Sequence, residues 1–291
     1  MQIPGRVFVV TGGGSGMGQQ VVLQLLEQWA HVAAVDVNAH GLEETVRMAG
    51  ADADRLSTHV VNVTDKEAVA RLPEEVLARH GQIDALLNVA GIIQRFARFK
   101  DLPADQVDRV LSVNFFGVVN TTKVFLPYLL ARPEAALLNV SSMGAFIPVP
   151  GQTIYGASKA AVKLFTEGLH AELRGSPVHV TVVFPGAVAT SITENSGVNA
   201  PGVAGANDNA KNPKMLSAAA AARLIIAGME RGKYRVLVGR DAMMMDWFTR
   251  LLPERAMIMI ADQMSGLLQH SSEPAPAPMT VPAEPGAATA R

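Results

Sequence analysis

Short apolar runs rich in β-branched residues alternate with helix-like stretches along most of the 291-residue chain. Two of these runs, HVAAVDV at 31–37 and VHVTVVF at 178–184, lack the regular polar alternation of a half-exposed strand. Such runs are typical of a parallel sheet covered by helices on both faces. Repeated strand–helix alternation implies right-handed crossovers and a doubly wound sheet. We predict a single α/β sheet with strands at 7–11, 32–36, 56–62, 83–89, 135–141, 178–184 and 234–238.

Helical patterns fall between the predicted strands, near 16–29, 40–49, 65–80, 103–131, 155–174 and 216–231. No linker interrupts this alternation, so we expect one domain over residues 1–240. Residues 187–214 are rich in Gly, Asn, Ala and Pro and are too long for an ordinary connection, which predicts a substrate loop. Residues 271–291 are rich in Pro and Ala with few large apolar side chains, which predicts a disordered tail.

Residues 241–270 predict one or two amphipathic helices, broken near Pro253. Six of the 13 methionines fall in this extension. Its apolar face has three open roles, which are a subunit interface, a substrate lid and contact with a membrane surface. The stretch has no lysine, so we rank the membrane last. Methionine suits surfaces that close over varied apolar ligands. We expect the extension and residues 187–214 to wall an apolar substrate pocket.

Composition excludes several classes of function. The net charge is −1, which argues against a nucleic-acid partner. The chain has no cysteine, and its seven histidines form no HExxH-like pair, so we expect no metal site. No uncharged apolar run approaches the roughly 18 residues of a membrane span. The first residues lack the charged, apolar and cleavage zones of a secretory signal, so we expect a cytoplasmic protein.

The first predicted strand runs into the glycine-rich sequence TGGGSGMG at 11–18. It does not fit G-x-G-x-x-G, because Met17 stands where the third glycine would fall. It fits T-G-x-x-x-G-x-G, with Thr11, Gly12, Gly16 and Gly18. A loop of this kind lets a phosphate approach the backbone where a helix begins. The alternative is a glycine-rich turn that binds no ligand.

Asp36 ends the second predicted strand, 18 residues after Gly18, where an acidic side chain would reach an adenosine ribose. Its carboxylate can accept hydrogen bonds from both ribose hydroxyls and would repel a 2′-phosphate. The neighbouring Ser15, Val37 and Asn38 offer no cation for such a phosphate. These residues predict NAD rather than NADP, although an Asp after a strand can also simply cap a helix.

Ser142 follows the fifth predicted strand, and Tyr155 and Lys159 lie one helical turn apart soon after it. Oxidising an alcohol with NAD needs a base for the hydroxyl proton. The pKa of tyrosine must fall from about 10 to near neutral for this task, a differential stabilisation of roughly 4 kcal/mol. The lysine cation, assisted by the positive nicotinamide ring, favours the phenolate, and the serine can hold the substrate oxygen. The alternative is an aromatic side chain with an incidental lysine beside it.

The glycine motif, Asp36, NVAG at 88–91, VNFFG at 113–117, the Ser142/Tyr155/Lys159 spacing and PGAVAT at 185–190 occur in an order that resembles the short-chain dehydrogenase/reductase family. The resemblance covers about residues 5–240 and implies a Rossmann-like sheet of about seven strands, usually assembled as dimers or tetramers. It implies Tyr155 as acid/base, Lys159 as pKa modulator and ribose ligand, and Ser142 as partner of the carbonyl oxygen. It also implies that Asn114 holds a water in a proton relay, whereas the sequence alone indicates only a buried amide.

The motifs and the resemblance together define the expected cofactor site. Its residues are Gly12, Ser15, Gly16, Met17, Gly18, Asp36, Asn62, Val63, Asn88, Ala90, Gly91, Tyr155, Lys159, Pro185, Gly186, Val188 and Thr190. The chain departs from the family at two positions. Val89 stands where the family often has Asn, and Asn62 stands where it often has Asp. We expect the amide oxygen of Asn62 to accept from the adenine amino group.

The sequence thus predicts an NAD-dependent oxidoreductase that interconverts a secondary alcohol, hydrophobic rather than sugar-like, and its ketone. A catalytically silent protein that binds a dinucleotide as a sensor or scaffold is the alternative. Such a protein would be expected to lose Tyr, Lys or Ser from the catalytic set, and this chain retains all three.

Overall fold

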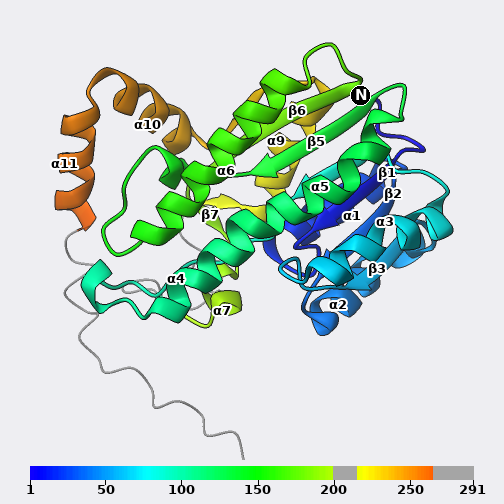
Figure 1. Cartoon of the computed structure of the whole chain (residues 1–291), viewed down its shortest axis with the longest axis horizontal. Coiled ribbons are helices and arrows are strands. Elements are labelled where there is room, and N and C mark those ends of the chain that lie inside the picture. Colours follow the sequence, from blue (N-terminus) through cyan, green and yellow to red (C-terminus); the bar gives the residue numbers. More distant parts are fainter. Residues whose placement is uncertain (199–214, 265–291) are drawn as a thin grey trace, which may run out of the picture.

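The computed structural model describes residues 1–198 and 215–264. Its centre is a seven-stranded parallel sheet in the order β3-β2-β1-β4-β5-β6-β9 (Figure 1). The predicted strands and the doubly wound topology are confirmed. The strands are β1 (Val7–Thr11), β2 (His31–Asp36), β3 (Leu56–Val60), β4 (Ala85–Asn88), β5 (Ala135–Val140), β6 (Val178–Pro185) and β9 (Arg235–Val238). The strand order reverses between β1 and β4, and ligands of such sheets bind beyond the carboxyl ends at this point.

Helices cover both faces of the sheet (Figure 1). One layer contains α1 (Gly16–Glu27), α2 (Ala39–Ala49) and α9 (Ala218–Glu230), and the other contains α3 (Lys66–His80), α5 (Gly117–Leu130) and α6 (Thr153–Glu172). Alternate residues of β1 serve the two layers. Phe8 and Val10 belong to the core that includes α1 and α9, whereas Val7 and Val9 belong to the core that includes α3 and α5. This double burial explains the continuous apolar runs of the sequence.

The sequence predicts one helix over 103–131, whereas the structure interrupts it. A π-helical turn, Ser112–Phe116, separates α4 (Ala104–Leu111) from α5. Among the described residues, Ala104–Leu130 is the one helix long and apolar enough by length and composition to cross a membrane. Phe125 and Leu129 of this helix are fully buried against the sheet. Its apolar character therefore serves the protein core.

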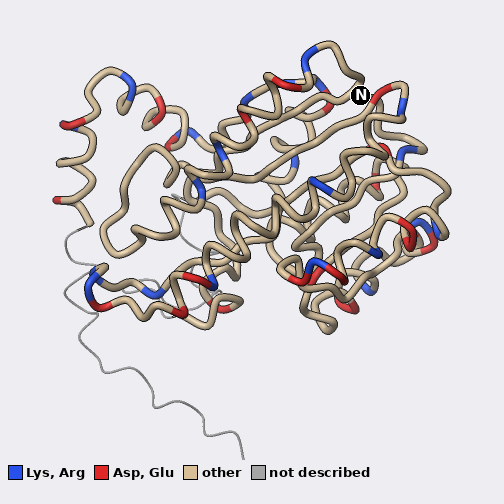
Figure 2. The backbone as a smooth tube through the Cα atoms, in the orientation of Figure 1, with Lys and Arg blue, Asp and Glu red and all other residues tan. Residues whose placement is uncertain are grey.

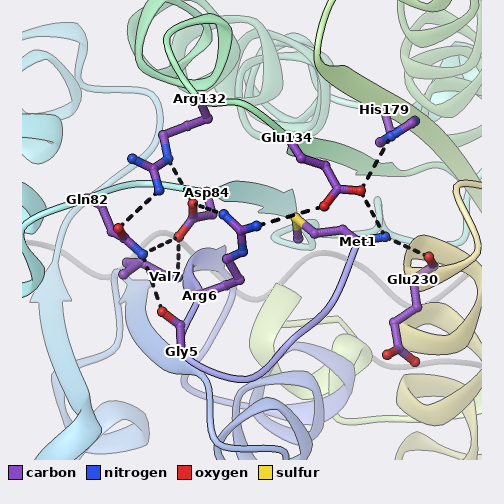
Figure 3. Close-up of polar contacts among 10 residues, drawn as sticks. All are labelled: Met1, Gly5, Arg6, Val7, Gln82, Asp84, Arg132, Glu134, His179 and Glu230. Carbon is purple, nitrogen blue, oxygen red and sulfur yellow. Dashed lines mark hydrogen bonds and ion pairs between the residues drawn. The ribbon is translucent and has the colours of Figure 1, made fainter.

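A buried ion-pair network around Asp84 holds the sheet at the ends where β1 and β4 begin (Figure 3). The Asp84 side chain is fully buried and accepts hydrogen bonds from Arg132 Nε at 2.8 Å and Arg6 Nη1 at 3.1 Å. It also accepts from the Val7 N–H and from Gln82 Nε2, each at 2.8 Å. A buried carboxylate is tolerated when cations and N–H groups satisfy it in this way. The network lies at the end of the sheet opposite the expected ligand site and is structural.

The chain beyond residue 240 forms α10 (Arg240–Leu251) and α11 (Pro253–Met264), with the break at the proline that the sequence indicates. These helices project from the sheet domain beside the first turns of α6 (Figure 1). Acidic and basic residues are interspersed along the described helices (Figure 2). The predicted tail at 271–291 and residues 199–214 of the predicted substrate loop lie outside the described residues.

The described part of residues 187–214 has structure that the sequence did not predict. β7 (Val188–Ala189) pairs in parallel with β8 (Leu216–Ser217), and the short helix α7 (Ile192–Ser196) follows β7. The two-residue ladder ties both ends of the loop together next to the end of β6. The beginning of the loop is therefore fixed close to the carboxyl edge of the sheet.

Candidate active site

A cavity of about 380 Å³ opens beyond the carboxyl ends of β1, β2 and β4. Many of the expected cofactor residues line it, namely Gly12, Ser15, Gly16, Met17, Gly18, Asp36, Asn62, Val63, Ala90, Gly91 and Thr190. The structure therefore brings together residues from five separate parts of the sequence. The remaining expected residues are Asn88, Tyr155, Lys159, Pro185, Gly186 and Val188, and their places are described below.

The glycine loop lies in close contact with neighbouring backbone, and two of its glycines leave no room for a Cβ. Gly12 has φ +76°, and a Cβ there would lie 2.9 Å from the backbone of Ala90. A Cβ on Gly18 would lie 2.0 Å from the Gly12 carbonyl oxygen, so α1 can begin here only with glycine. The first turn of α1 has neither a side-chain cap nor an acidic residue. Its N–H groups are consequently available to an anion, which fits a dinucleotide pyrophosphate.

Asp36 is fixed at the edge of the cavity by two backbone N–H groups. Its Oδ2 accepts from Gly14 N and its Oδ1 from Asn38 N, both at 2.9 Å. Each carboxylate oxygen keeps a lone pair for a ribose hydroxyl. The lining also includes Arg109 of α4, an exposed cation that sequence reasoning missed. No local pattern connects Arg109 with Asp36, because α4 reaches the cavity only through the fold.

The amide oxygen of Asn62 is already occupied. It accepts from the Thr64 N–H at 3.0 Å and from the Thr64 hydroxyl at 2.9 Å. Both contacts lie within the turn after β3, and the side chain still borders the cavity. The hydrogen bond from the adenine amino group to Asn62 stays a prediction.

Tyr155, Lys159 and Ser142 meet where β5 ends and α6 begins. Ser142 Oγ and Tyr155 Cε1 would each lie 3.5 Å from a Cβ on Gly144, so the serine and tyrosine side chains are neighbours. Lys159 Nζ lies 5.9 Å from the centre of the Tyr155 ring and donates to the Val140 carbonyl oxygen at 3.1 Å. A Cβ on Gly91 would lie 3.1 Å from Lys159 Nζ, so the lysine reaches the floor of the cavity.

Burial controls the protonation of both titrating groups in this cluster. It raises the pKa of Tyr155 above its ordinary value, and the hydrogen bond from Ser142 acts in the opposite direction. Burial also lowers the pKa of Lys159 from 10.5 to about 8. The sequence-based expectation of a lowered tyrosine pKa is therefore not met by the protein side chains alone. They hold Tyr155 protonated at neutral pH, because desolvation disfavours the phenolate.

Asn114 lies in the π-helical turn and is fully buried. Its Oδ1 accepts from Ile92 N at 2.8 Å, and its Nδ2 donates to the Ile92 carbonyl oxygen at 2.9 Å and to Ser158 Oγ at 3.0 Å. A Cβ on Gly91 would lie 3.3 Å from Asn114 Oδ1. Asn114 and Lys159 therefore flank Gly91. The side-chain amide of Asn114 connects the loop after β4 to α6. π-Helical turns are frequent at functional sites.

The side chain of Asn88 lies inside the sheet domain rather than in the cavity lining. It donates to Asn139 Oδ1 at 2.9 Å and accepts from Thr121 Oγ1 at 2.8 Å, which joins β4 to β5 and α5. The N–H of Val89, the residue that departs from the family, donates to Thr11 Oγ1 at 3.1 Å. This contact with β1 is made by the backbone, so the replacement by valine leaves it intact.

The loop Pro185–Thr190 is held against the C-terminal helix α10. Asp241 Oδ2 accepts from Ala187 N at 2.6 Å, and a Cβ on Gly186 would lie 2.2 Å from the same carboxylate. Val188 continues this loop into β7, and Thr190 lies beside Gly16 of the glycine loop. Asp241 is a further residue that sequence reasoning missed. Among the described residues, no cluster of His, Cys, Asp and Glu could hold a metal ion.

Comparison with known proteins identifies the family. Residues 6–200 match the family model of the short chain dehydrogenases, and the chain belongs to this family. It is 36% identical over 261 residues to SadH of Mycobacterium tuberculosis, a protein with an oxidoreductase name, over 85% of this chain and 91% of SadH. It is 35% identical over 194 residues to the 3-oxoacyl-[acyl-carrier-protein] reductase FabG of Thermotoga maritima, over 67% of this chain and 78% of FabG.

Solved structures show the same fold. A short chain dehydrogenase/reductase from Burkholderia phymatum in complex with NAD superposes with a TM-score of 0.75 at 24% identity, over 86% of this chain and 96% of that one. A short chain dehydrogenase from Burkholderia cenocepacia in complex with NADP gives 0.73 at 27% identity, over 89% and 99%. The chain is therefore a family oxidoreductase with an NAD(P)-binding fold, and the family acts on small molecules.

Proposed function

We propose that the protein is an NAD-dependent dehydrogenase that interconverts a hydrophobic secondary alcohol and its ketone, with Tyr155 as acid/base. The observation that carries this proposal is the meeting of Tyr155, Ser142 and Lys159 beside a cavity that Asp36 borders. The alternative of a silent dinucleotide sensor is disfavoured because Tyr155, Ser142 and Lys159 are all present in one cluster.

Each side chain has a defined task in the oxidation direction. When bound, the oxidised dinucleotide supplies a hydride acceptor and a positive charge near Tyr155. Tyr155 as phenolate takes the proton of the alcohol, and the hydrogen leaves carbon as hydride. The Ser142 hydroxyl donates to the substrate oxygen as it becomes a carbonyl. Lys159 favours the phenolate by its charge, and Asn114 keeps the backbone at Ile92 in place beside it.

The preference for NAD rests on Asp36. Its carboxylate is held toward the cavity by Gly14 and Asn38, and a 2′-phosphate would bring negative charge against it. Arg109 in the same lining favours NADP instead, because a guanidinium binds phosphate well. We propose that Asp36 dominates, because it is anchored by two hydrogen bonds whereas Arg109 is exposed.

A hydrophobic substrate is supported by a second cavity of about 380 Å³. Apolar residues of the loop 144–150 and the first turns of α6 line it, together with Met257 and Ala261 of α11. It reaches Gly144, where a Cβ would lie 3.5 Å from both Tyr155 Cε1 and Ser142 Oγ. The likeness to FabG favours a second candidate, the reduction of a 3-oxoacyl thioester, which is also a ketone on an apolar chain.

We further propose a cytoplasmic homodimer or homotetramer. The exposed apolar side chains of Phe116, in the π-helical turn before α5, and Leu164 of α6 would be covered in such an assembly.

The proposed function is tested by following the absorbance of the reduced nicotinamide. A panel of secondary alcohols and ketones of graded size and polarity should include a 3-oxoacyl thioester. Turnover that rises with apolar chain length supports the proposal. Dinucleotide binding without turnover of any member would favour the silent sensor.

A further inference from the structure

Gln94 lies in the connection between β4 and α4 and is almost completely buried, with 1% of its surface exposed. Neither the glycine motif nor the catalytic spacing includes it. A buried amide side chain needs partners for its donor and its acceptor. Gln94 finds all of them at the beginning of α6, about 60 residues further along the chain.

The side chain of Gln94 caps the helix that carries Tyr155. Its Oε1 accepts from Ile154 N at 2.8 Å and from Tyr155 N at 3.0 Å. The residue in the N-cap position of α6 is Gln152, whose side chain makes no capping hydrogen bond. The first N–H groups of a helix need hydrogen-bond acceptors, and the side chain of the N-cap residue usually provides one. In this protein the acceptor comes from Gln94 in a distant loop.

Two further hydrogen bonds cross between the same segments. Gln94 Nε2 donates to the Gly151 carbonyl oxygen at 2.9 Å. In return, Gln152 Nε2 donates to the Gln94 carbonyl oxygen at 2.8 Å. The loop and the helix start are thus joined by four hydrogen bonds that involve these two glutamines. We call this set of contacts the glutamine clamp.

Gln94 of the clamp lies in the same short loop as Gly91, which forms the floor of the dinucleotide cavity. Gly91 lies against Lys159 and Asn114, and both backbone polar groups of Ile92 bind the Asn114 side chain. Gln94 follows only two residues later. The loop therefore runs from the cavity floor, past the lysine, to the backbone N–H of the tyrosine.

We propose that Gln94 is a positioning residue that sets the place of Tyr155 relative to Ser142 and Lys159. The inference rests on the proposed function, since it assigns Gln94 a task in the turnover by Tyr155. Gln94 touches no reacting atom. It acts by holding the first turn of α6 through the N–H of Tyr155 itself, so its loss displaces the hydroxyl while the cavity residues stay in place.

Three variants test the proposal. Gln94→Met keeps the size of the side chain and removes its acceptor and donors. Gln94→Glu keeps an acceptor for Ile154 N and Tyr155 N. Gln106→Met is the matched control, because Gln106 Oε1 of α4 accepts from Arg95 N of the same loop at 3.2 Å and makes no hydrogen bond to the described residues of α6. Thermal melting establishes that each variant is folded.

We expect Gln94→Met to lower kcat about tenfold or more, as the loss of a helix cap of typical strength predicts, with the Kd for NADH changed less than about threefold. Gln94→Glu should restore only part of kcat, because it keeps the acceptor but loses the donor to the Gly151 carbonyl oxygen. Gln106→Met should stay near the parent. Amide hydrogen exchange in peptides covering 152–160 should accelerate in Gln94→Met alone. This second measurement needs no turnover.

Equal losses of kcat in Gln94→Met and Gln106→Met would overturn the proposal, because the loop as a whole would then be responsible. Unchanged exchange at the start of α6 in Gln94→Met would also overturn it. If the parent protein has no turnover with any substrate, the proposed function fails, whereas the exchange experiment still decides whether Gln94 caps the helix.

Discussion

The carboxylate of Asp241 accepts a hydrogen bond from the backbone N–H of Ala187 at 2.6 Å. This contact joins the first turn of α10 to the loop Pro185–Thr190, which continues to Thr190 in the cavity lining. The helices beyond residue 240 are therefore connected to the dinucleotide cavity, although the family model matches only residues 6–200.

Asp241→Ala should weaken dinucleotide binding. The Ala187 N–H loses its acceptor, and the loop before Thr190 loses its fixed position, so we expect the Kd for NADH to rise about tenfold. Fluorescence titration measures this. Asp246→Ala is the control, because Asp246 lies on the same helix and pairs with Arg235 and Arg250 instead. A similar rise in both variants would mean that the helix matters only for folding.

The role of α11 in substrate choice can be tested only if Asp241 is kept. We therefore predict the effect of deleting residues 253–291, which leaves α10 in place. Loss of Met257 and Ala261 from the apolar cavity should lower kcat/KM about tenfold more for a bulky apolar alcohol than for a small polar one. Equal losses for both alcohols would contradict the proposed substrate class. Met257→Ser, compared with Met244→Ser, provides the matched single substitutions, because both methionines are exposed and Met257 but not Met244 lines this cavity.

Asp36 should make NAD the preferred dinucleotide by at least about tenfold in kcat/KM, or about 1.4 kcal/mol. Replacing Asp36 by Ala and Val37 by Arg should narrow or reverse this preference, because the repulsion is removed and a cation is added. Arg109→Ala should reduce whatever use the parent makes of NADP. Equal rates of the parent with the two dinucleotides would refute the assignment of Asp36.

Tyr155→Phe should remove nearly all turnover while the Kd for NADH stays near that of the parent, because only the transferable proton is lost. Lys159→Ala should reduce both turnover and dinucleotide binding, since Lys159 reaches the cavity floor at Gly91. Steady-state rates and fluorescence titration separate the two effects. Near-normal turnover by Tyr155→Phe would show that another group carries the proton.

The pKa of Lys159 predicts a pH dependence of the stability of the dinucleotide-free protein. The folded protein takes up this proton only below about pH 8, whereas the unfolded chain takes it up below 10.5. Between these values the unfolded state binds more protons, so stability rises with pH. Compared with Lys159→Met, the parent should gain about 3 kcal/mol between pH 8 and 10.5. Denaturant unfolding of both proteins at the two ends of this range measures the difference, and parallel curves would contradict the lowered pKa.

The sheet could be predicted because the continuous apolar runs of its strands indicate burial on both faces. Val7 to Val10 are apolar at every position, and the structure buries alternate residues in two different cores. The cavity lining could be predicted to a large extent because its glycines and Asp36 occur at fixed distances from strand ends. These signals are local, and the fold only has to bring the strand ends to one edge.

The rest depends on contacts between distant segments. The π-helical turn around Asn114 has no signal in its neighbours, because its side chain is satisfied by Ile92 from another loop. Gln94 and Asp241 act on backbone groups far along the chain, so no spacing reveals them. The direction in which the pKa of Tyr155 shifts also depends on burial, and charged neighbours in the sequence do not reveal burial.

The hydrogen bond from Ala187 to Asp241 also bears on the synthesis of the protein. The glycine loop follows β1 in the middle of the sheet, whereas Asp241 comes after β9, the last strand of that sheet along the chain. A ribosome adds roughly 5–20 residues per second. A nascent chain thus contains the glycine loop and Tyr155 seconds before the residue that fixes Ala187 exists. The full set of contacts around the dinucleotide cavity is therefore assembled only after Asp241 has been synthesised.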